Sequence, residues 1–196
     1  MVDSLRHGKV MWVGIGLVAG LAVGSLLPST PLHAMATDRS ENIVMATGYV
    51  DDFVEGVFFL DSLTGMLRGG VPSARAQMMN YQAVWTANVA ADMTTAVRMV
   101  NAAAARVKGG AARPAIQAPQ TPRFLMCTGQ LDIRAGSARM RPGRCVIYVA
   151  EANTGIVMTY AVPWSMQMHS ANQVLQMPMT LWAAQQLPTA VLRAEE

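Results

Sequence analysis

Two short signatures each occur twice in this chain of 196 residues, and they occur in the same order. The sequence MATGYVD at residues 45–51 returns as MCTGQLD at residues 126–132. The sequence VFFLDSLTG at residues 57–65 is echoed by IYVAEANTG at residues 147–155. Such a recurrence indicates a duplicated structural unit, and the architecture of that unit limits what the whole chain can fold into.

Both copies have the composition of β-strands, because they are rich in β-branched and aromatic residues. In the first copy, strands are expected at residues 43–49, 54–60, 66–71 and 81–89. In the second copy, they are expected at residues 124–133, 145–150, 156–162 and 179–184. Turns fall at Ser62–Gly65 and Asn153–Gly155, and Pro72 and Pro163 end equivalent strands.

The correspondence is weakest for the fourth strands, where the strand that contains Trp182 would match the strand that contains Trp85 at a different spacing. Four strands with hairpin turns resemble a propeller blade, but two blades cannot close a propeller. The sequence therefore predicts a mainly β protein in which two four-stranded, blade-like repeats form one antiparallel barrel or sandwich. Pairing of the exposed edges within one chain favours this arrangement.

Changes in composition divide the chain into eight segments. They are a cytoplasmic N-terminus at 1–9, an apolar segment at 10–27, a spacer at 28–42, the first β repeat at 43–89, an inserted helix at 91–108, a Pro/Ala linker at 109–122, the second β repeat at 123–184 and a C-terminal tail at 185–196. Asp92 is the expected cap of the inserted helix, and Gly109 and Gly110 are its expected end.

The apolar segment 10–27 carries no charged residue. Eighteen helical residues reach about 27 Å, which is close to the hydrocarbon thickness of a bilayer. Arg6 and Lys9 precede the segment, and positive charge before a span places the N-terminus in the cytoplasm. The sequence therefore predicts a single-pass protein of the inner membrane, in contact with the lipid bilayer, whose C-terminal domain lies in the periplasm.

Three glycines recur at four-residue spacing in this segment, namely Gly16, Gly20 and Gly24. This spacing places them on one helix face, where two membrane helices can approach closely, so they are candidate helix-packing residues of a homo-oligomer. The alternative is a secretory signal peptide that is cleaved after Ala36, which would leave a periplasmic or secreted protein. The length of the apolar run favours the uncleaved signal-anchor.

The formal net charge of +3 is small and comes from scattered arginines, so no nucleic-acid partner is expected. The two cysteines, Cys127 and Cys145, invite a disulfide in an oxidising compartment. A hairpin between their strands places Cys127 opposite about residue 150 and Cys145 opposite about residue 132, on the register of an antiparallel ladder. A bridge would need a different strand pairing.

Acidic side chains gather in one connection of the first copy: Asp51, Asp52 and Glu55, followed by Asp61. Arginines gather in the corresponding connection of the second copy: Arg139, Arg141 and Arg144. The acidic cluster would suit calcium if its oxygens converged, but aspartates are common in turns, which is the interpretation we favour. The acidic and basic connections are alternatively expected to meet across an interface and to set its orientation.

A methionine-rich stretch carries the most specific chemical hypothesis. On a strand, Met166 and Met168 would point to the same face, with His169 next to them. Thioether sulfur and imidazole are ligands that suit Cu(I), and the stretch at 164–179 locally resembles the Met-x-Met segments of extracytoplasmic copper carriers. Because methionine also fills irregular gaps in protein cores and the chain has sixteen methionines, a structural role without a cofactor is the interpretation we favour.

Catalytic motifs are poorly represented. A Ser-His-Asp arrangement would depend on His169 alone, because His7 and His33 precede the outer domain. A zinc site built from Cys127, Cys145 and His169 matches no standard ligand spacing. Six aromatic residues, Tyr81, Trp85, Tyr148, Tyr160, Trp164 and Trp182, are expected to form cross-strand core pairs rather than a ligand groove.

Several stretches together resemble a group of planctomycete-type single-pass envelope proteins with a duplicated β-repeat and no assigned activity. They are the apolar anchor running into PLHA at 31–34, ATG at 46–48, VFFLD at 57–61, LTG at 63–65, FLMCTG at 124–129 and YVAE at 148–151. The resemblance spans nearly the whole chain except the Ala-rich helix and the Pro-rich linker. It implies an envelope location and the repeat, and it assigns no catalytic residue.

These observations favour a membrane-anchored, extracytoplasmic structural or interaction module of the cell envelope. Such a protein is expected to act as a homo-oligomer or with other envelope proteins, and not as an enzyme. A periplasmic protein that binds Cu(I) or a small ligand through the segment 164–179 is the alternative.

Overall fold

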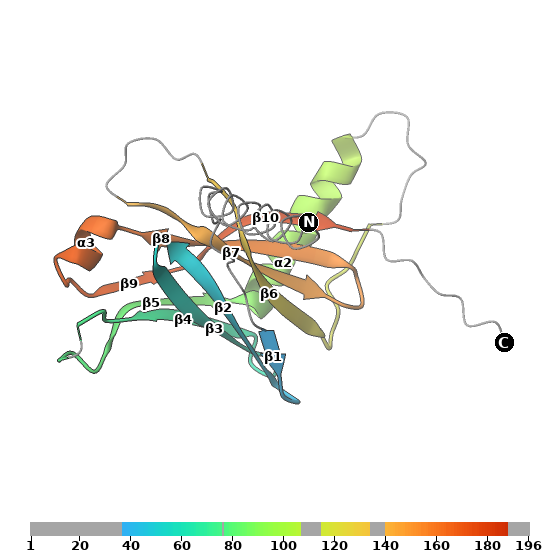
Figure 1. Cartoon of the computed structure of the whole chain (residues 1–196). Coiled ribbons are helices and arrows are strands. Elements are labelled where there is room, and N and C mark those ends of the chain that lie inside the picture. The colour runs from blue at the N-terminus through green and yellow to red at the C-terminus, as the bar shows by residue number, and fades with distance from the viewer. Residues whose placement is uncertain (1–36, 76, 107–114, 134–139, 188–196) are drawn as a thin grey trace, which may run out of the picture. The chain divides into compact units, whose positions relative to one another are not determined.

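The computed structural model describes residues 37–75, 77–106, 115–133 and 140–187 (Figure 1). The predicted anchor at 10–27, with Gly16, Gly20 and Gly24, lies outside the described residues. Within the described ranges, no helix is both long enough and apolar enough to cross a membrane.

The first β-sheet, sheet A, has six strands in the spatial order β1-β2-β3-β4-β5-β9. Their bounds are β1 Thr37–Arg39, β2 Ile43–Asp51, β3 Val54–Asp61, β4 Met66–Pro72, β5 Tyr81–Asn88 and β9 Leu175–Pro178. Strands β1 to β5 pair antiparallel as a meander, and β9 adds to β5 in parallel.

The second sheet, sheet B, has four antiparallel strands in the order β10-β8-β7-β6. Their bounds are β6 Phe124–Gln130, β7 Arg141–Glu151, β8 Ile156–Trp164 and β10 Thr180–Gln186. Two helices complete the described elements: α2 at Val89–Arg106 and α3 at Met166–Ser170. The mainly β fold predicted from the sequence is confirmed.

The internal repeat is also confirmed, because the two copies pair their strands in the same register. In the first copy Ile43 pairs with Asp61, and at the equivalent positions of the second copy Phe124 pairs with Glu151. Further along the same two strand pairs, Thr47 lies opposite Val57, and Thr128 lies opposite Ile147. The two signatures therefore follow equivalent backbone paths.

The turn that ends each second signature is built the same way twice. Gly65 and Gly155 have φ values of 67° and 69°, a conformation that glycine adopts without steric cost. Each glycine donates its N–H to the carbonyl oxygen four residues earlier, on Asp61 and Glu151 respectively. The carboxylates of these same two residues accept hydrogen bonds from the turn, so both copies form this hairpin with the same combination of glycine and carboxylate.

The fourth strands correspond too, but their tryptophans do not. The residue after each fourth strand donates its N–H to the glycine carbonyl of the turn, from Val89 to Gly65 and from Leu187 to Gly155. A register shift in β10 occurs at Trp182, between Leu181 and Ala183. The predicted match of the two strands is therefore confirmed, although Trp182 falls at the register shift and is 48% exposed, whereas Trp85 is buried.

Sheet A is larger than the predicted four strands because segments from outside the first copy complete it. Strand β1 comes from the expected spacer, and β9 comes from the second copy. The predicted tail beginning at residue 185 is also wrong at its start, since Gln185 and Gln186 belong to β10. Exposed strand edges recruit any extended segment within reach, which composition alone does not reveal.

Helix α2 begins earlier than predicted. The side chain of Asn88 accepts a hydrogen bond of 2.9 Å from the N–H of Ala91, so Asn88 caps the helix directly at the end of β5. The predicted cap, Asp92, lies inside the first turn and accepts a 3.1 Å hydrogen bond from the hydroxyl of Tyr160. The expected end of the helix at Gly109 lies outside the described residues.

The expected linker is fastened to α2 where it is described. Ile116 exchanges two hydrogen bonds with the side chain of Asn101, at 2.9 and 3.0 Å, and its own side chain packs against the core. The core itself lies between the two sheets, where α2 adds one apolar stripe that includes Met93 and Val97. The chain crosses from sheet A to sheet B at the buried Met179, between β9 and β10.

Candidate interaction surface

The sheets meet closely at one glycine on β2. A side chain at Gly48 would collide with the sulfur of Cys145 on β7 and would crowd Thr128 on β6. The hydroxyl of Thr128 donates to the backbone carbonyl of Thr47 across the same junction. Strand β2 therefore crosses directly over β6 and β7, and this crossing brings the acidic connection of the first copy to the arginines of the second.

Two ion pairs join those connections. Arg141 contacts Asp51 at 3.4 Å, and Arg144 contacts Asp52. The meeting of acidic and basic connections predicted from the sequence is therefore confirmed for these four residues. Because both arginines and Asp52 are more than half exposed, their attraction is screened by water, and the pairs chiefly orient the sheets.

Asp51 is the buried member of this group, with an exposed fraction of 4%. One of its carboxylate oxygens accepts a 2.9 Å hydrogen bond from the indole N–H of Trp164, and the other accepts one of 2.9 Å from the N–H of Asp52. A buried carboxylate is tolerated when it is hydrogen-bonded in this way. Asp61 lies at the opposite end of β3, so the carboxylates of the hypothetical calcium cluster do not converge.

A column of rings runs from the core toward this junction. Phe58 stacks on Trp85 at 6.2 Å, Trp85 lies 6.1 Å from Trp164, and Trp164 lies 5.1 Å from His169 between ring centroids. The indole N–H of Trp85 donates to the carbonyl of Pro163 at 2.9 Å. The predicted core role of the aromatics is thus confirmed for Trp85 and Trp164.

His169 closes the column on α3, where Gln82 of β5 holds its carbonyl oxygen at 2.8 Å. The Nδ1 atom of His169 is buried and has no hydrogen-bond partner among the described residues. Burial lowers the pKa of His169, and the negative charge of Asp51 opposes part of that effect. The ring is therefore held in its neutral form more strongly than in water.

The methionines proposed for copper do not share a face. Met166 and Met168 lie on the short helix α3 and not on a strand, so about 200° of rotation separates their side chains. Met166 is 36% exposed, whereas Met168 packs against the core. The geometric premise of the copper hypothesis is wrong for Met166, and it leaves Met168 and His169 as neighbours in the chain.

The two cysteine thiols are free. Cys127 is opposite Tyr148, and Cys145 is opposite Gln130, which agrees with the out-of-register arrangement predicted from the hairpin to within about two residues. Cys145 is buried in the core and Cys127 is exposed. Since their side chains lie on opposite faces of sheet B, they do not share a zinc site with His169. Among the described residues there is no group of three or more His, Cys, Asp or Glu that suits a metal ion.

The outer face of sheet B carries no charged side chain between its ends. Alternate residues of β6, β7 and β8 face the core, so their neighbours in sequence face outward. We use the name sheet-B face for the outward residues that are at least partly exposed: Leu125, Cys127, Tyr148, Ala150, Val157, Thr159 and Trp182. Val146 and Ala161 lie on the same face but are buried. Leu125 and Trp182 are each 48% exposed, which makes this an apolar surface of the kind found at interaction sites.

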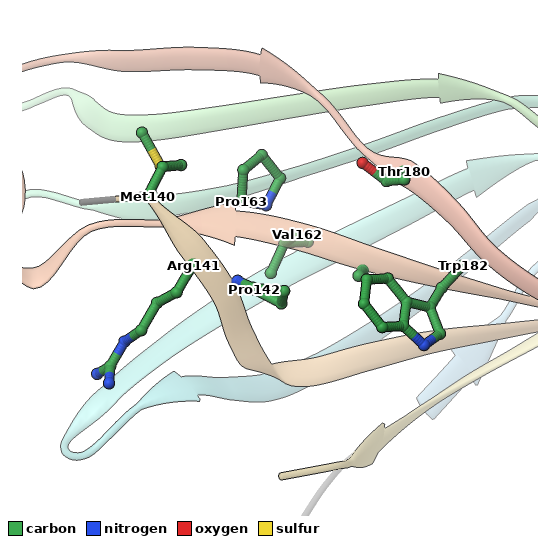
Figure 2. A pocket seen from close by; sticks show the side chains of 8 residues that line it. Met140, Arg141, Pro142, Val162, Pro163, Thr180 and Trp182 are labelled. Atoms are coloured by element: carbon green, nitrogen blue, oxygen red, sulfur yellow. The ribbon is translucent and has the colours of Figure 1, made fainter. Parts of the chain in front are cut away.

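A shallow groove of about 130 Å³ opens at one end of this face (Figure 2). Its lining is apolar except at two positions and consists of Met140, Arg141, Pro142, Ala161, Val162, Pro163, Thr180 and Trp182. Figure 2 shows Pro142 and Pro163 at its centre, the indole of Trp182 on one side and the guanidinium of Arg141 on the other. The groove is too small for a typical small-molecule pocket of roughly 300–1,000 Å³.

One residue at the sheet junction is exposed to an unusual degree. Phe53 forms the hairpin turn between β2 and β3 together with Asp52, and it is 100% exposed. Its φ of 59° lies in the left-handed region, where a bulky residue is rare. Neither the exposure of Phe53 nor the groove is predicted by the sequence patterns. A phenylalanine at a turn position that favours glycine or asparagine was the available signal.

The surface therefore combines an uncharged sheet face, a small apolar groove and an exposed phenylalanine around an Asp–Arg junction. Comparison of this chain with models of protein families, with curated proteins and with solved structures finds no match.

Proposed function

We propose that this protein is a membrane-anchored, extracytoplasmic interaction module of the cell envelope that works as a subunit of an assembly. The sheet-B face is the observation that carries the proposal. In a folded domain, exposed apolar side chains without interspersed charge are characteristic of surfaces that bind another macromolecule. The apolar segment 10–27 supports the anchored location, because its length suits a bilayer span.

The described chemistry supports a binding role over a catalytic one. The buried carboxylates Asp51 and Glu151 are engaged in hydrogen bonds that maintain the fold. The thiol of Cys145 is buried, and burial raises its pKa to about 12, so it is not a nucleophile at neutral pH. These three side chains therefore have a structural role in the sheets where they lie.

Membrane fractionation with a reporter fused at the C-terminus tests the location. The full-length protein is expected in the inner-membrane fraction with the reporter in the periplasm, and removal of residues 1–36 is expected to release it. Recovery of the intact chain from the cytoplasmic fraction would refute the anchored location. Cross-linking at native abundance, followed by gentle detergent extraction, tests the assembly, and a purely monomeric product would refute that part.

Cu(I) binding is the second candidate function, and one observation favours it. The buried Nδ1 of His169 has no hydrogen-bond partner among the described residues, and Met168 is its neighbour in the chain. Titration with Cu(I) under reducing conditions would compare the wild type with Met168→Leu and His169→Phe. Met99→Leu serves as the matched control, because Met99 lies exposed on α2. An affinity that is the same in all four proteins would exclude this site.

A further inference from the structure

Phe53 has no role in stabilising the fold of a single copy. Its side chain is fully exposed, so it buries no apolar area within the described domain. Its left-handed backbone conformation costs roughly 1–3 kcal/mol for a residue that is not glycine. An exposed aromatic side chain in a strained turn position indicates a contact outside the chain.

Hydrogen bonds and an ion pair fix the backbone of the turn that carries Phe53. Asp51 accepts hydrogen bonds from the N–H of Asp52 and from the indole of Trp164, and Asp52 pairs with Arg144. These contacts tie the turn to both sheets, so little backbone entropy remains to be lost when the side chain of Phe53 binds. The backbone that presents the phenyl ring is therefore preorganised.

The groove beside Pro142 and Pro163 has the size and chemistry that a phenyl ring requires. Its volume is about 130 Å³, and an apolar cavity of roughly 150 Å³ binds benzene. Trp182 supplies an aromatic wall for edge or offset contact with a second ring (Figure 2). A single aromatic side chain is therefore a group of the size that this groove suits.

Charge matches the two features to each other. Asp52 and Glu55 flank Phe53 and are exposed, which makes the tip of the hairpin acidic. Arg141 lines the groove with a side chain that is 55% exposed. Because Asp52 and Arg141 each have an ion-pair partner within their own copy, these charges would chiefly set the orientation in which two copies meet.

The positions of the turn and the groove allow the contact to be mutual. The ion pair between Asp51 and Arg141 places the base of the turn next to the rim of the groove in the same copy. A two-fold axis near this junction would bring the turn of each copy toward the groove of the other. This is the isologous arrangement that most homodimers adopt.

We propose that two copies of this chain form a two-fold dimer in which Phe53 of each copy inserts into the groove lined by Pro142, Pro163 and Trp182 of the other. This contact rests on the proposed function as an assembly subunit, and it names a second copy as the partner. In this dimer the ion pairs between Asp51 and Arg141 and between Asp52 and Arg144 would also fix the position of Phe53 relative to the groove of the same copy.

The decisive variant is Phe53→Gly in the full-length chain, reconstituted in mild detergent. Glycine removes the phenyl ring and suits the positive φ, so the domain is expected to keep or increase its thermal stability.

The dimerisation constant of Phe53→Gly, measured by analytical ultracentrifugation, is expected to weaken tenfold or more. Trp182→Ala removes the groove wall and is expected to weaken it similarly. Leu63→Ala is the matched control, because Leu63 is 78% exposed in another turn.

A photo-cross-linking residue at position 53 identifies what Phe53 touches. The expected product is a covalent dimer with the link near residues 140–142 or 161–182 of the second copy. A link to lipid or to another protein would overturn the dimer, as would an unchanged dimerisation constant in Phe53→Gly.

The double variant Gly16→Leu with Gly20→Leu distinguishes the proposed assembly function from the proposed Phe53 contact. If only these anchor changes abolish dimers, the assembly function stands and the Phe53 contact falls.

Discussion

The two repeats share one backbone plan and differ in what faces away from the core. On the outer face of sheet A, the exposed Met45 and Phe59 lie opposite each other, with Arg68 next to Phe59 in the adjacent strand. Their equivalents in the second copy, Met126 and Val149, lie opposite each other as well but are buried in the core. The two copies therefore turn opposite faces of the same strand plan toward the core, and the face of sheet B that points outward has no charge between its ends.

The buried turn of the second copy provides the largest expected contrast. Glu151 is fully buried and accepts hydrogen bonds from the N–H groups of Arg123, Asn153 and Thr154 and from the hydroxyl of Thr154. Glu151→Ala leaves several donors without partners and should lower the free energy of unfolding by about 2–4 kcal/mol. Asp61→Ala, at the matching exposed turn, should lower it less. Urea denaturation of both variants measures the difference, and equal losses would contradict the asymmetry.

Equivalent glycines should respond differently because only one lies between the sheets. Gly48→Ala would drive a methyl group into the sulfur of Cys145 and should cost about 1–3 kcal/mol of stability through overpacking. Gly129→Ala, at the corresponding position of β6, would meet only the ring of Tyr148 at 2.6 Å, which lies on the outer face and can turn aside. Thermal denaturation distinguishes them. A smaller effect at Gly48 than at Gly129 would place the sheet junction elsewhere.

Acid should weaken the second copy through His169, which has no counterpart in the first. Burial lowers the pKa of His169 below its ordinary value of 6.5. The unfolded chain therefore takes up a proton at a higher pH than the folded chain, so stability is full above about pH 6.5 and declines as the pH falls below it. His169→Phe should flatten this part of the stability profile between pH 7 and 5. A slope that survives the substitution would assign the titration to another group.

Thiol labelling should separate the two cysteines without changing stability. Cys127 is exposed on β6, whereas burial raises the pKa of Cys145 to about 12. A thiol-specific reagent should therefore modify Cys127 rapidly and Cys145 only on global unfolding. Mass spectrometry of the labelled peptides gives both rates. Rapid labelling of Cys145 in the native protein would mean that the two sheets separate locally.

Much of the fold followed from patterns within each repeat. The strands near residues 43, 54, 66 and 124 begin where the alternation and the turn residues predict, because those signals are local. The predicted start of helix α2 at residue 91 lies two residues after the observed start at Val89. The predicted cap, Asp92, is wrong because Asn88, the last residue of β5, caps the helix. The fourth strand of the second copy is predicted at 179–184 and lies at Thr180–Gln186, and its bulge at Trp182 has no clear signal in the sequence.

The candidate site was less predictable. The sequence indicated that Asp51 and Asp52 would meet the arginines of the second copy, because opposite charges occupied equivalent connections. It misjudged Met166 and Met168, since Ser165 caps a short helix by accepting from the N–H of Met168 at 3.4 Å. Neither the groove nor the exposure of Phe53 was apparent, because both depend on how two distant hairpins come together.

By itself, the sequence determined the duplication, the strand positions, the paired turns and the apolar segment 10–27, because each is a pattern over neighbouring residues. Only the tertiary structure decided that β1 and β9 complete sheet A, that β2 crosses β7, and that the charge-free face lies outside sheet B. Those outcomes depend on competition among strand edges and on packing between segments roughly a hundred residues apart. Local composition does not encode the result of that competition.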